Sequence, residues 1–260
     1  FLFLVIFSFI ALAIGKYDYQ TLVTDSSLAF RKPNSEYWFG TDNLGRDYWC
    51  QVWYATQVSI RLALIVAVGE SILGVIIGLI WGYVRKLDRF FTELYNICDN
   101  IPSTIILILI SYVASPSIQT LILGMSITGW IAMARFIRNQ ILIIRDRDYN
   151  VASRCIGTPT IRIVLRNLLP YLVSVIMLRM ALTIPEAIGN EVFITYIGLG
   201  LSVETPSLGN LVNDGRKVMM QAGLRYQLLY PTLILSFVTI AFYLIGNAFS
   251  DAADPKNHLQ

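Results

Sequence analysis

The sequence predicts an all-α polytopic membrane protein with six transmembrane helices. Hydrophobic residues occupy 55% of the 260 positions and charged residues only 14%, whereas an average soluble domain is about 45–50% apolar and about 25% charged. A soluble domain of this size has too few polar groups to cover so much apolar surface. The composition therefore excludes the soluble and disordered classes. The net charge of +3 is too small to favour a nucleic-acid partner.

The predicted spans are the segments that approach about 20 apolar residues, the length at which a helix crosses a hydrocarbon core of about 30 Å. They are Phe1–Gly15, Leu62–Val84, a tight hairpin of two spans within Asn100–Ala134, Leu168–Pro185 and Tyr226–Ser250. We interpret Phe1–Gly15 as a truncated first span rather than a signal peptide, because further spans follow it. The predicted organisation is a truncated helix at 1–15, an extracellular loop at 16–57 and a transmembrane domain at 58–260.

Two apolar segments do not fit a single straight span, and each requires an interruption of the helix. Asn100–Ala134 is uncharged but too long for one span, and Ser115-Pro116-Ser117 interrupts it. Val192–Val203 is too short to cross a membrane. It is either the end of a bent fifth span or a dipping segment buried by protein, with Pro185 and Gly189 as the expected breaks.

The basic residues predict the orientation. If both termini are cytoplasmic, the inner connectors and the tail carry 11 Lys and Arg residues and the outer connectors carry 7. This bias agrees with the positive-inside rule. We therefore expect a multi-pass protein with both ends in the cytoplasm.

Enzyme chemistry is not indicated. The only histidine is His258, near the end of the chain, and the three cysteines are scattered without a CxxC spacing. No phosphate-binding G-x-x-x-x-G-K-[ST] motif occurs, and Gly209–Lys217 has the wrong spacing for one. We expect no catalytic residue, no metal and no cofactor bound by this chain.

The segment Arg145–Pro170, called the elbow below, is long and amphipathic for a connector. Gly157 is expected to end a first short helix, and Thr158 and Pro159 fit the N-cap and first turn of a second. The predicted apolar positions are Val151, Ala152, Cys155 and Ile156 in the first helix and Ile161, Val164, Leu165 and Leu168 in the second. Together with Arg154, Arg162 and Arg166, this surface suits either a partner protein or anionic lipid headgroups.

The elbow resembles the conserved cytoplasmic loop of permease subunits of bacterial binding-protein-dependent ABC importers. That pattern is Glu-Ala-Ala, three residues, Gly, nine residues, Ile, any residue and Leu-Pro. Ala152, Gly157, Leu169 and Pro170 match in register, whereas Val151, Ser153 and Asn167 replace the Glu, the second Ala and the Ile.

Three further segments resemble oligopeptide and dipeptide permeases. They are Phe39–Asp47 before the second span, Gly198–Leu201 followed by Thr205–Gly209, and Asp251–Lys256 near the C-terminus. The similarity extends over residues 37–257. The segment Gly157–Met177 looks most similar to the C-type oligopeptide permease of Gram-positive bacteria.

This resemblance implies a type I ABC importer permease fold with a cytoplasmic coupling helix, in the bacterial plasma membrane. The implied function is import of oligopeptides by ATP-driven alternating access. Alternatives are the same architecture carrying dipeptides, nickel or another small solute and, more distantly, an integral membrane enzyme. The implied partners are a second homologous permease, two cytoplasmic ATPases that bind ATP and Mg²⁺, an extracellular lipid-anchored peptide-binding protein, and membrane lipid. The implied coupling residues are Ala152, Ser153, Arg154, Gly157, Thr158, Pro159, Arg162 and Pro170.

Charges within the fifth span suggest a translocation path. Arg179, Glu186 and Glu191 follow one another at helical distances, and a buried charge is costly unless it faces a watery path or a partner. The alternative is that Arg179 is a structural ion-pair partner, with Glu70 as the candidate, and that the two later glutamates lie at the membrane interface.

Other patterns leave two interpretations open. Gly74, Gly78 and Gly82 share one helix face and allow close packing, either within this chain or against a second permease. Trp38, Trp49 and Trp53 suit either the delivery protein or an interfacial belt. The Thr41–Asp47 loop lacks calcium-ligand spacing and is expected to be a turn that leads into the second span.

Overall fold

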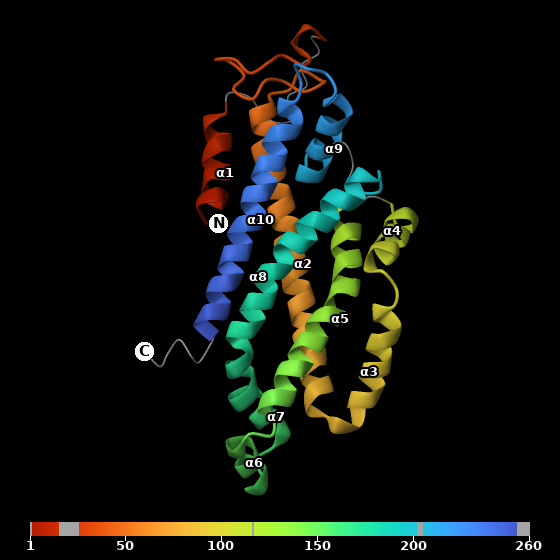
Figure 1. Cartoon of the computed structure of the whole chain (residues 1–260), viewed down its shortest axis with the longest axis vertical. Coiled ribbons are helices and arrows are strands. Elements are labelled where there is room, and N and C mark those ends of the chain that lie inside the picture. The colour runs from red at the N-terminus through yellow and green to blue at the C-terminus, as the bar shows by residue number, and fades with distance from the viewer. Residues whose placement is uncertain (1, 16–25, 116, 202–204, 254–260) are drawn as a thin grey trace.

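The structure is a computed structural model that describes residues 2–15, 26–115, 117–201 and 205–253. Residues 16–25 of the predicted outer loop, residues 254–256 of the C-terminal motif and His258 lie outside this described part. The described chain is almost entirely helical, which confirms the all-α class (Figure 1). The helices are α1 (Leu2–Ile14), α2 (Tyr48–Tyr83), α3 (Arg85–Asp99), α4 (Ser103–Val113), α5 (Ile118–Ile144), α6 (Asp148–Cys155), α7 (Thr160–Ile163), the π-helical turn η2 (Val164–Leu168), α8 (Leu169–Tyr196), α9 (Leu208–Val218) and α10 (Tyr226–Ala253).

The predicted count of six spans is not reached. Four helical stretches in the described chain are long and apolar enough to cross a membrane, and α3 with α4 makes a fifth if this pair is one span bent by 72°. α1 is apolar but shorter. The expected division within Asn100–Ala134 falls where it was predicted, between Val113 at the end of α4 and Ile118 at the start of α5, but α4 has only 11 residues and α5 continues past Ala134 to Ile144.

The second span begins earlier than predicted. α2 starts at Tyr48, so residues 48–57 are helical and are not part of an outer loop. Asp47 caps the helix by accepting a hydrogen bond from the Trp49 amide at 3.0 Å. Gln51, Thr56 and Ser59 are buried in this first part of α2, so these polar residues face protein and not water.

The Thr41–Asp47 loop is a compact turn ahead of α2, as expected. Asp42 accepts hydrogen bonds from the backbone amides of Leu44 and Arg46 at 2.9 and 2.8 Å, and Thr41 and Asp47 form an isolated β-bridge. Gln227, at the start of α10, donates a hydrogen bond to the Thr41 carbonyl at 2.9 Å. The turn therefore fastens the beginnings of α2 and α10 to each other.

The glycine face of α2 packs within this chain, against α5. An added Cβ at Gly78 would lie 2.6 Å from the Ala134 carbonyl oxygen, and one at Gly82 would lie 2.8 Å from the Ile141 Cβ. At Gly74 it would overlap Met133. Of the two interpretations left open by the sequence, this face therefore fits packing within the chain, because its small residues bring two helices of the same chain together.

The fifth span is longer than predicted and unbroken. Thr160–Tyr196 forms one stretch of 37 helical residues that includes α7, η2 and α8. Pro185 and Gly189 lie inside α8 and do not end it. The Val192–Val203 run is therefore the end of this span up to Tyr196, followed by a turn at Gly198, where φ is +85°.

Trp38, Trp49 and Trp53 lie in an aromatic cluster around the beginning of α2. The Trp49 ring nitrogen donates to the Ala11 carbonyl at 2.9 Å, and Trp53 packs edge-on against Phe7. Trp38 contacts Trp49 but remains 42% exposed. Trp49 and Trp53 thus join α2 to α1, and Trp38 alone of the three keeps a large exposed surface.

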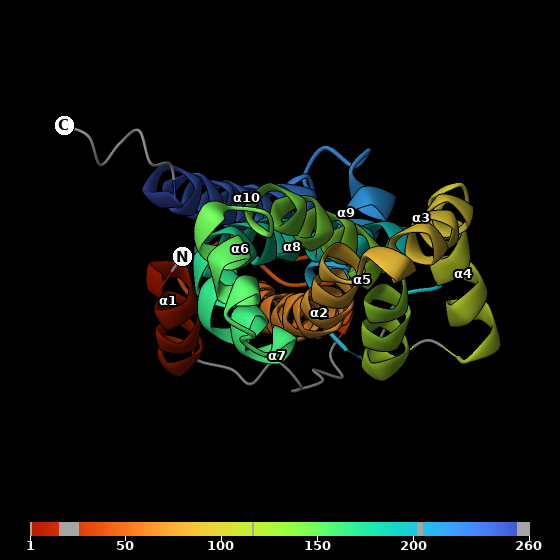
Figure 2. The same cartoon turned by 90° about the horizontal axis from the view of Figure 1, so that it is seen from below.

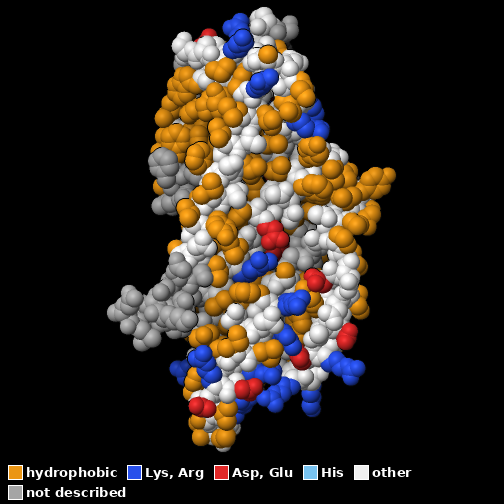
Figure 3. All heavy atoms as spheres, in the orientation of Figure 1, with side chains coloured by type: hydrophobic (Ala, Val, Ile, Leu, Met, Phe, Trp, Pro, Cys, Tyr) orange, Lys and Arg blue, Asp and Glu red, His pale blue; other side chains and the backbone are white. Residues whose placement is uncertain are grey.

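Packing places α2 inside the bundle, with α1 and α4 at opposite edges when the molecule is viewed from the elbow end (Figure 2). A large buried cluster joins α2, α8, α9 and α10, and a smaller one joins the lower part of α5 to η2 and α8. Lys and Arg side chains gather at the elbow end, and hydrophobic side chains cover much of the flank above it (Figure 3).

Candidate functional site

The elbow projects from one end of the bundle as two short helices joined at Gly157 (Figure 1). Gly157 has φ of +80°. Its amide donates to the Arg154 carbonyl, and the Thr158 amide donates to the Ser153 carbonyl, both at 3.0 Å. This is the Schellman arrangement, in which a residue in the left-handed region closes a helix. The prediction that Gly157 ends the first helix is confirmed.

The beginning of the second helix differs from the prediction. Pro159 occupies the N-cap position of α7, and Thr160 is its first residue. The expected cap at Thr158 is therefore wrong by one position, because the turn that closes α6 uses the Thr158 amide. η2 then carries α7 directly into α8, with Pro170 in the first turn of α8, just after the π-helical turn.

Two asparagines hold the elbow in shape. Asn150 is fully buried, and its side-chain amide donates to the Ile144 carbonyl at the end of α5 at 2.8 Å. The Asn167 amide donates to the Asn150 side-chain oxygen at 2.9 Å. These contacts join α5, α6 and η2. Asn167, which stands where the family pattern has Ile, therefore forms a hydrogen bond across the turn of the elbow.

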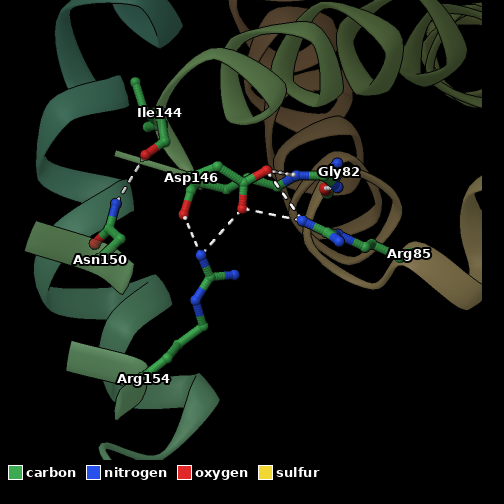
Figure 4. A network of polar contacts seen from close by, with 7 residues as sticks. Gly82, Arg85, Ile144, Asp146, Asn150 and Arg154 are labelled. Atoms are coloured by element: carbon green, nitrogen blue, oxygen red, sulfur yellow. Dashed lines mark hydrogen bonds and ion pairs between the residues drawn. The ribbon is translucent and has the colours of Figure 1, made fainter. Parts of the chain in front are cut away.

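Asp146 is the centre of a charged network between the elbow and the α2–α3 junction (Figure 4). Its carboxylate accepts hydrogen bonds from Arg154 at 3.0 Å, Arg145 at 3.1 Å and Arg85 at 3.2 Å. The Arg154 hydrogen bond, reinforced by Arg145, outweighs desolvation and lowers the pKa of the Asp146 carboxyl below 3.8. Arg145 also donates to the Gly82 carbonyl at 2.7 Å.

The elbow exposes apolar side chains beside its cations. Ile156 is 82% exposed and Ile161 is 65% exposed, and Val151 and Leu165 are also exposed. Val164 and Leu168, predicted to share the stripe of the second helix, are buried instead and pack onto α5. Of the implied coupling residues, Ala152, Arg154, Gly157, Pro159, Arg162 and Pro170 are exposed, whereas Ser153 and Thr158 are half-buried.

A second polar feature, called the charged pocket below, lies between α2, α4, α5 and α8. Its volume is about 330 Å³, and Glu70, Asp99, Arg179 and Glu186 contribute charges to its lining. Arg179 and Glu186 face each other at 3.8 Å from the same side of α8. Two of the three predicted path residues thus line one cavity, together with Glu70.

Glu191 does not line this cavity, which corrects the third path prediction. It is fully buried and accepts hydrogen bonds from Ser207 at 2.7 Å, Ser59 at 3.1 Å and Thr195 at 3.3 Å. Ser207 also caps α9. The carboxylate therefore joins α2, α8 and the first turn of α9, where its charge also suits the helix dipole.

Sequence patterns did not single out Asp146 or Asn150, and they marked Asn167 only as a departure from the family pattern. Each makes contacts with residues outside its own helical turn, so no local periodicity marks it. The charge of Asp146 among several arginines was the one available signal. In the described residues, no group of three or more His, Cys, Asp or Glu is placed to hold a metal.

Residues 74–258 match the family described as "Binding-protein-dependent transport system inner membrane component". The chain belongs to this family. The permease is 39% identical over 258 residues to the oligopeptide transport system permease protein AmiD of Streptococcus pneumoniae, covering 98% of this chain and 83% of the relative. It is 33% identical to the dipeptide permease DppC and 31% identical to the oligopeptide permease OppC of Bacillus subtilis, again over 258 residues, covering 98% and 97% of this chain and 80% and 82% of those relatives.

The permease also shares its fold with a chain of the MetNI methionine ABC transporter in an inward-facing conformation. The TM-score is 0.64 at 18% identity, covering 78% of this chain and 97% of that one. The fold is therefore that of a type I ABC importer permease. The members of this family are membrane components of transport systems and not enzymes. Membership therefore makes this chain a multi-pass membrane protein and implies ATPase and substrate-binding partners.

Proposed function

We propose that this permease imports oligopeptides across the bacterial plasma membrane by ATP-driven alternating access. The observation that carries the proposal is the 39% identity to an oligopeptide permease over 98% of this chain. The 33% identity to a dipeptide permease makes dipeptides the second candidate substrate class. Nickel or another small solute is a weaker alternative, because the three relatives described above are named as oligopeptide or dipeptide permeases.

The elbow is the proposed contact with the ATPases. Its exposed Ile156 and Ile161, flanked by Arg154 and Arg162, suit a cleft on a partner protein. The Asn150 contact fixes α6 to the end of α5, and Asp146 links Arg154 of α6 to Arg85 at the start of α3. ATP-driven closure of the ATPases therefore moves the elbow as a rigid body, and η2 passes the motion into α8.

The ATP and Mg²⁺ belong to two partner ATPase subunits in this proposal, because the sequence lacks a phosphate-binding loop. A second homologous permease completes the path, and an extracellular lipid-anchored protein delivers the peptide from outside. The concentration of Lys and Arg at the elbow end supports a cytoplasmic elbow (Figure 3). The start of α1 and the end of α10 point toward the same side (Figure 1), which supports cytoplasmic termini.

Transport in proteoliposomes tests this function. The permease is reconstituted with its second permease, its ATPases and its binding protein, and ATP-dependent uptake of labelled oligopeptide, dipeptide and Ni²⁺ is measured. We expect uptake of the oligopeptide. Uptake of Ni²⁺ or the dipeptide without the oligopeptide contradicts the proposed substrate class, and transport that survives deletion of Arg154–Arg166 contradicts the proposed role of the elbow.

A further inference from the structure

Acidic side chains outnumber basic ones in the charged pocket. Glu70, Asp99 and Glu186 line it, whereas Arg179 is its one basic lining residue. Asp99 pairs with Arg135 at 3.9 Å, and Glu186 pairs with Arg179 at 3.8 Å. Across the described part of the chain, Glu70 has no ion pair within 4 Å and receives no side-chain hydrogen bond. The pocket thus contains one carboxylate whose charge is not matched by a close partner.

The shape of the bundle holds the Glu70 carboxyl group in place. Glu70 reaches from α2 to α5, where a Cβ added at Gly129 would overlap its carboxyl carbon and both of its oxygens. Gly129 also lines the pocket. The absence of a side chain at position 129 therefore makes the space in which the carboxylate sits.

An unmatched carboxylate in a membrane-embedded bundle is costly, so such a group normally faces a partner or a watery path. A cationic ligand that enters the pocket removes much of this cost. An ammonium group supplies the charge together with three hydrogen-bond donors. A metal ion fits less well, because the described residues include no group of acids, His and Cys arranged to coordinate one.

The size of the pocket limits what it accepts. A volume of about 330 Å³ is at the lower end of the range of about 300–1,000 Å³ for small-ligand sites, so it holds an end of a peptide and not a whole oligopeptide. Every unmodified peptide carries an α-ammonium group at one end, whatever its sequence. Recognition of that group suits a carrier that accepts many sequences.

We propose that the charged pocket is a subsite for the α-ammonium group of the peptide in transit, with Glu70 as its direct ligand. This inference rests on the proposed function, since it takes peptides as the substrate. Glu186 and Arg179 border the same cavity as a loose pair, so they contribute polar surface beside the bound group. A Lys or Arg side chain of the peptide is the competing occupant, and the experiment separates the two.

The test compares a labelled peptide that lacks Lys and Arg with its N-acetylated form, in the full reconstituted transporter at saturating binding protein. The measured quantity is the ratio of the uptake rates of the free and the acetylated peptide. Because every permease variant is assayed with the same binding protein, the preference of that protein cancels between variants. The variants are Glu70→Gln, which keeps the shape of the side chain, and Gly129→Ala, which displaces the carboxyl group. Glu93→Gln, an exposed acid on α3, is the matched control.

We expect the wild type to favour the free peptide and Glu70→Gln to lower this ratio about tenfold, the size of one hydrogen bond to a charged group. Gly129→Ala is expected to lower it in the same direction, and Glu93→Gln to leave it unchanged. If the free-to-acetylated uptake ratio of Glu70→Gln stays at the wild-type value, the subsite inference is overturned. Peptide uptake by the wild type would still support the proposed function in that case. An effect of Glu70→Gln confined to peptides with Lys or Arg side chains also overturns it. Absence of any peptide uptake by the wild type overturns both.

Discussion

The Asn167 side chain donates a hydrogen bond to the Asn150 side chain across the turn of the elbow, at 2.9 Å. Asn150 in turn donates to the Ile144 carbonyl at the end of α5. One buried side chain thereby connects both arms of the elbow to a membrane-spanning helix. This relationship makes Asn150 the first position at which the proposed rigid-body motion can be tested.

Replacing Asn150 with Ala should loosen the elbow without removing any exposed residue. The change leaves the Asn167 amide without its acceptor, and the Ile144 carbonyl keeps only the Arg147 amide at 3.3 Å; a polar group left unsatisfied in this way costs about 1–3 kcal/mol where it is buried. We expect transport per ATP hydrolysed to fall while basal hydrolysis continues, as measured by parallel uptake and phosphate-release assays. Asn139→Ala, an exposed residue of α5, is the control. Equal coupling in both variants would show that the Asn150 contacts do not transmit the motion.

Substitutions at Gly157 should depend on backbone preference more than on side-chain size. Its φ of +80° disfavours most L-residues by about 1–2 kcal/mol, whereas Asn adopts this region more readily. No atom lies within 4 Å of an added Cβ, so space itself is available. We expect Gly157→Asn to retain most coupled transport and Gly157→Val to lose much of it. If the two variants are equally impaired, side-chain volume at the partner surface is the better explanation.

The Asp146 network should respond to acid and salt in a defined direction. Folding lowers the pKa of the Asp146 carboxyl. The charge of Asp146 therefore stabilises the folded protein fully above the unfolded pKa of about 3.9, and this stabilisation is lost as the pH falls through the lowered pKa. We expect the difference in amide hydrogen exchange of α6 between wild type and Asp146→Asn to be full at about pH 6 and to vanish only below 3.8.

The Asp146 side chain is 43% exposed, so salt should also screen the network. About 0.5 M salt should reduce the exchange difference at neutral pH, because the Debye length is then only a few ångströms. A difference that persists in salt and in acid would assign the effect of Asp146→Asn to packing and not to charge.

Two glycines of the bundle should respond in opposite ways to larger side chains. Gly78→Leu places a Cβ 2.6 Å from the Ala134 carbonyl oxygen and 2.7 Å from the Ile137 Cβ, so α2 and α5 must separate. We expect a loss of stability of about 1–3 kcal/mol, seen as a lower unfolding temperature in detergent. Gly189→Ala meets no atom within 4 Å and should raise stability by about 0.5–1 kcal/mol through helix propensity. The reverse order would contradict the described packing of α2 on α5.

Glu191 should affect stability and not substrate charge preference. Glu191→Leu leaves the hydroxyls of Ser59, Thr195 and Ser207 without their shared acceptor. We expect a lower unfolding temperature and faster proteolysis near α9, with the free-to-acetylated uptake ratio of the surviving protein unchanged. A change in that ratio would return Glu191 to the translocation path.

Local patterns were sufficient for features set by neighbouring residues. Gly157 was placed correctly because a left-handed turn needs a glycine at one position, and the Thr41–Asp47 turn was evident from its Asp and Gly residues. The beginning of α2 was missed because hydropathy treats Gln51 and Thr56 as residues that face water, whereas both are buried against protein. Composition alone does not distinguish these two surroundings.

Features that depend on distant contacts were not predictable in this way. α3 was assigned to a connector because it carries charges, yet its Asp88 pairs with Arg138 of α5 at 2.7 Å, and that pairing requires the three-dimensional arrangement. Glu191 was placed on the path because a charge within a span suggests water. The structure surrounds it with hydroxyl groups contributed by three helices instead.

The unbroken stretch Thr160–Tyr196 has a geometric consequence for transport. At a rise of 1.5 Å per residue it is a rod of roughly 55 Å, well beyond the hydrocarbon thickness of about 30 Å. If this stretch stays rigid, a rotation of about 10° about its elbow end displaces its opposite end by roughly 10 Å. A small rotation of the elbow would therefore become a displacement of several ångströms at the far end of α8, with no joint along the way.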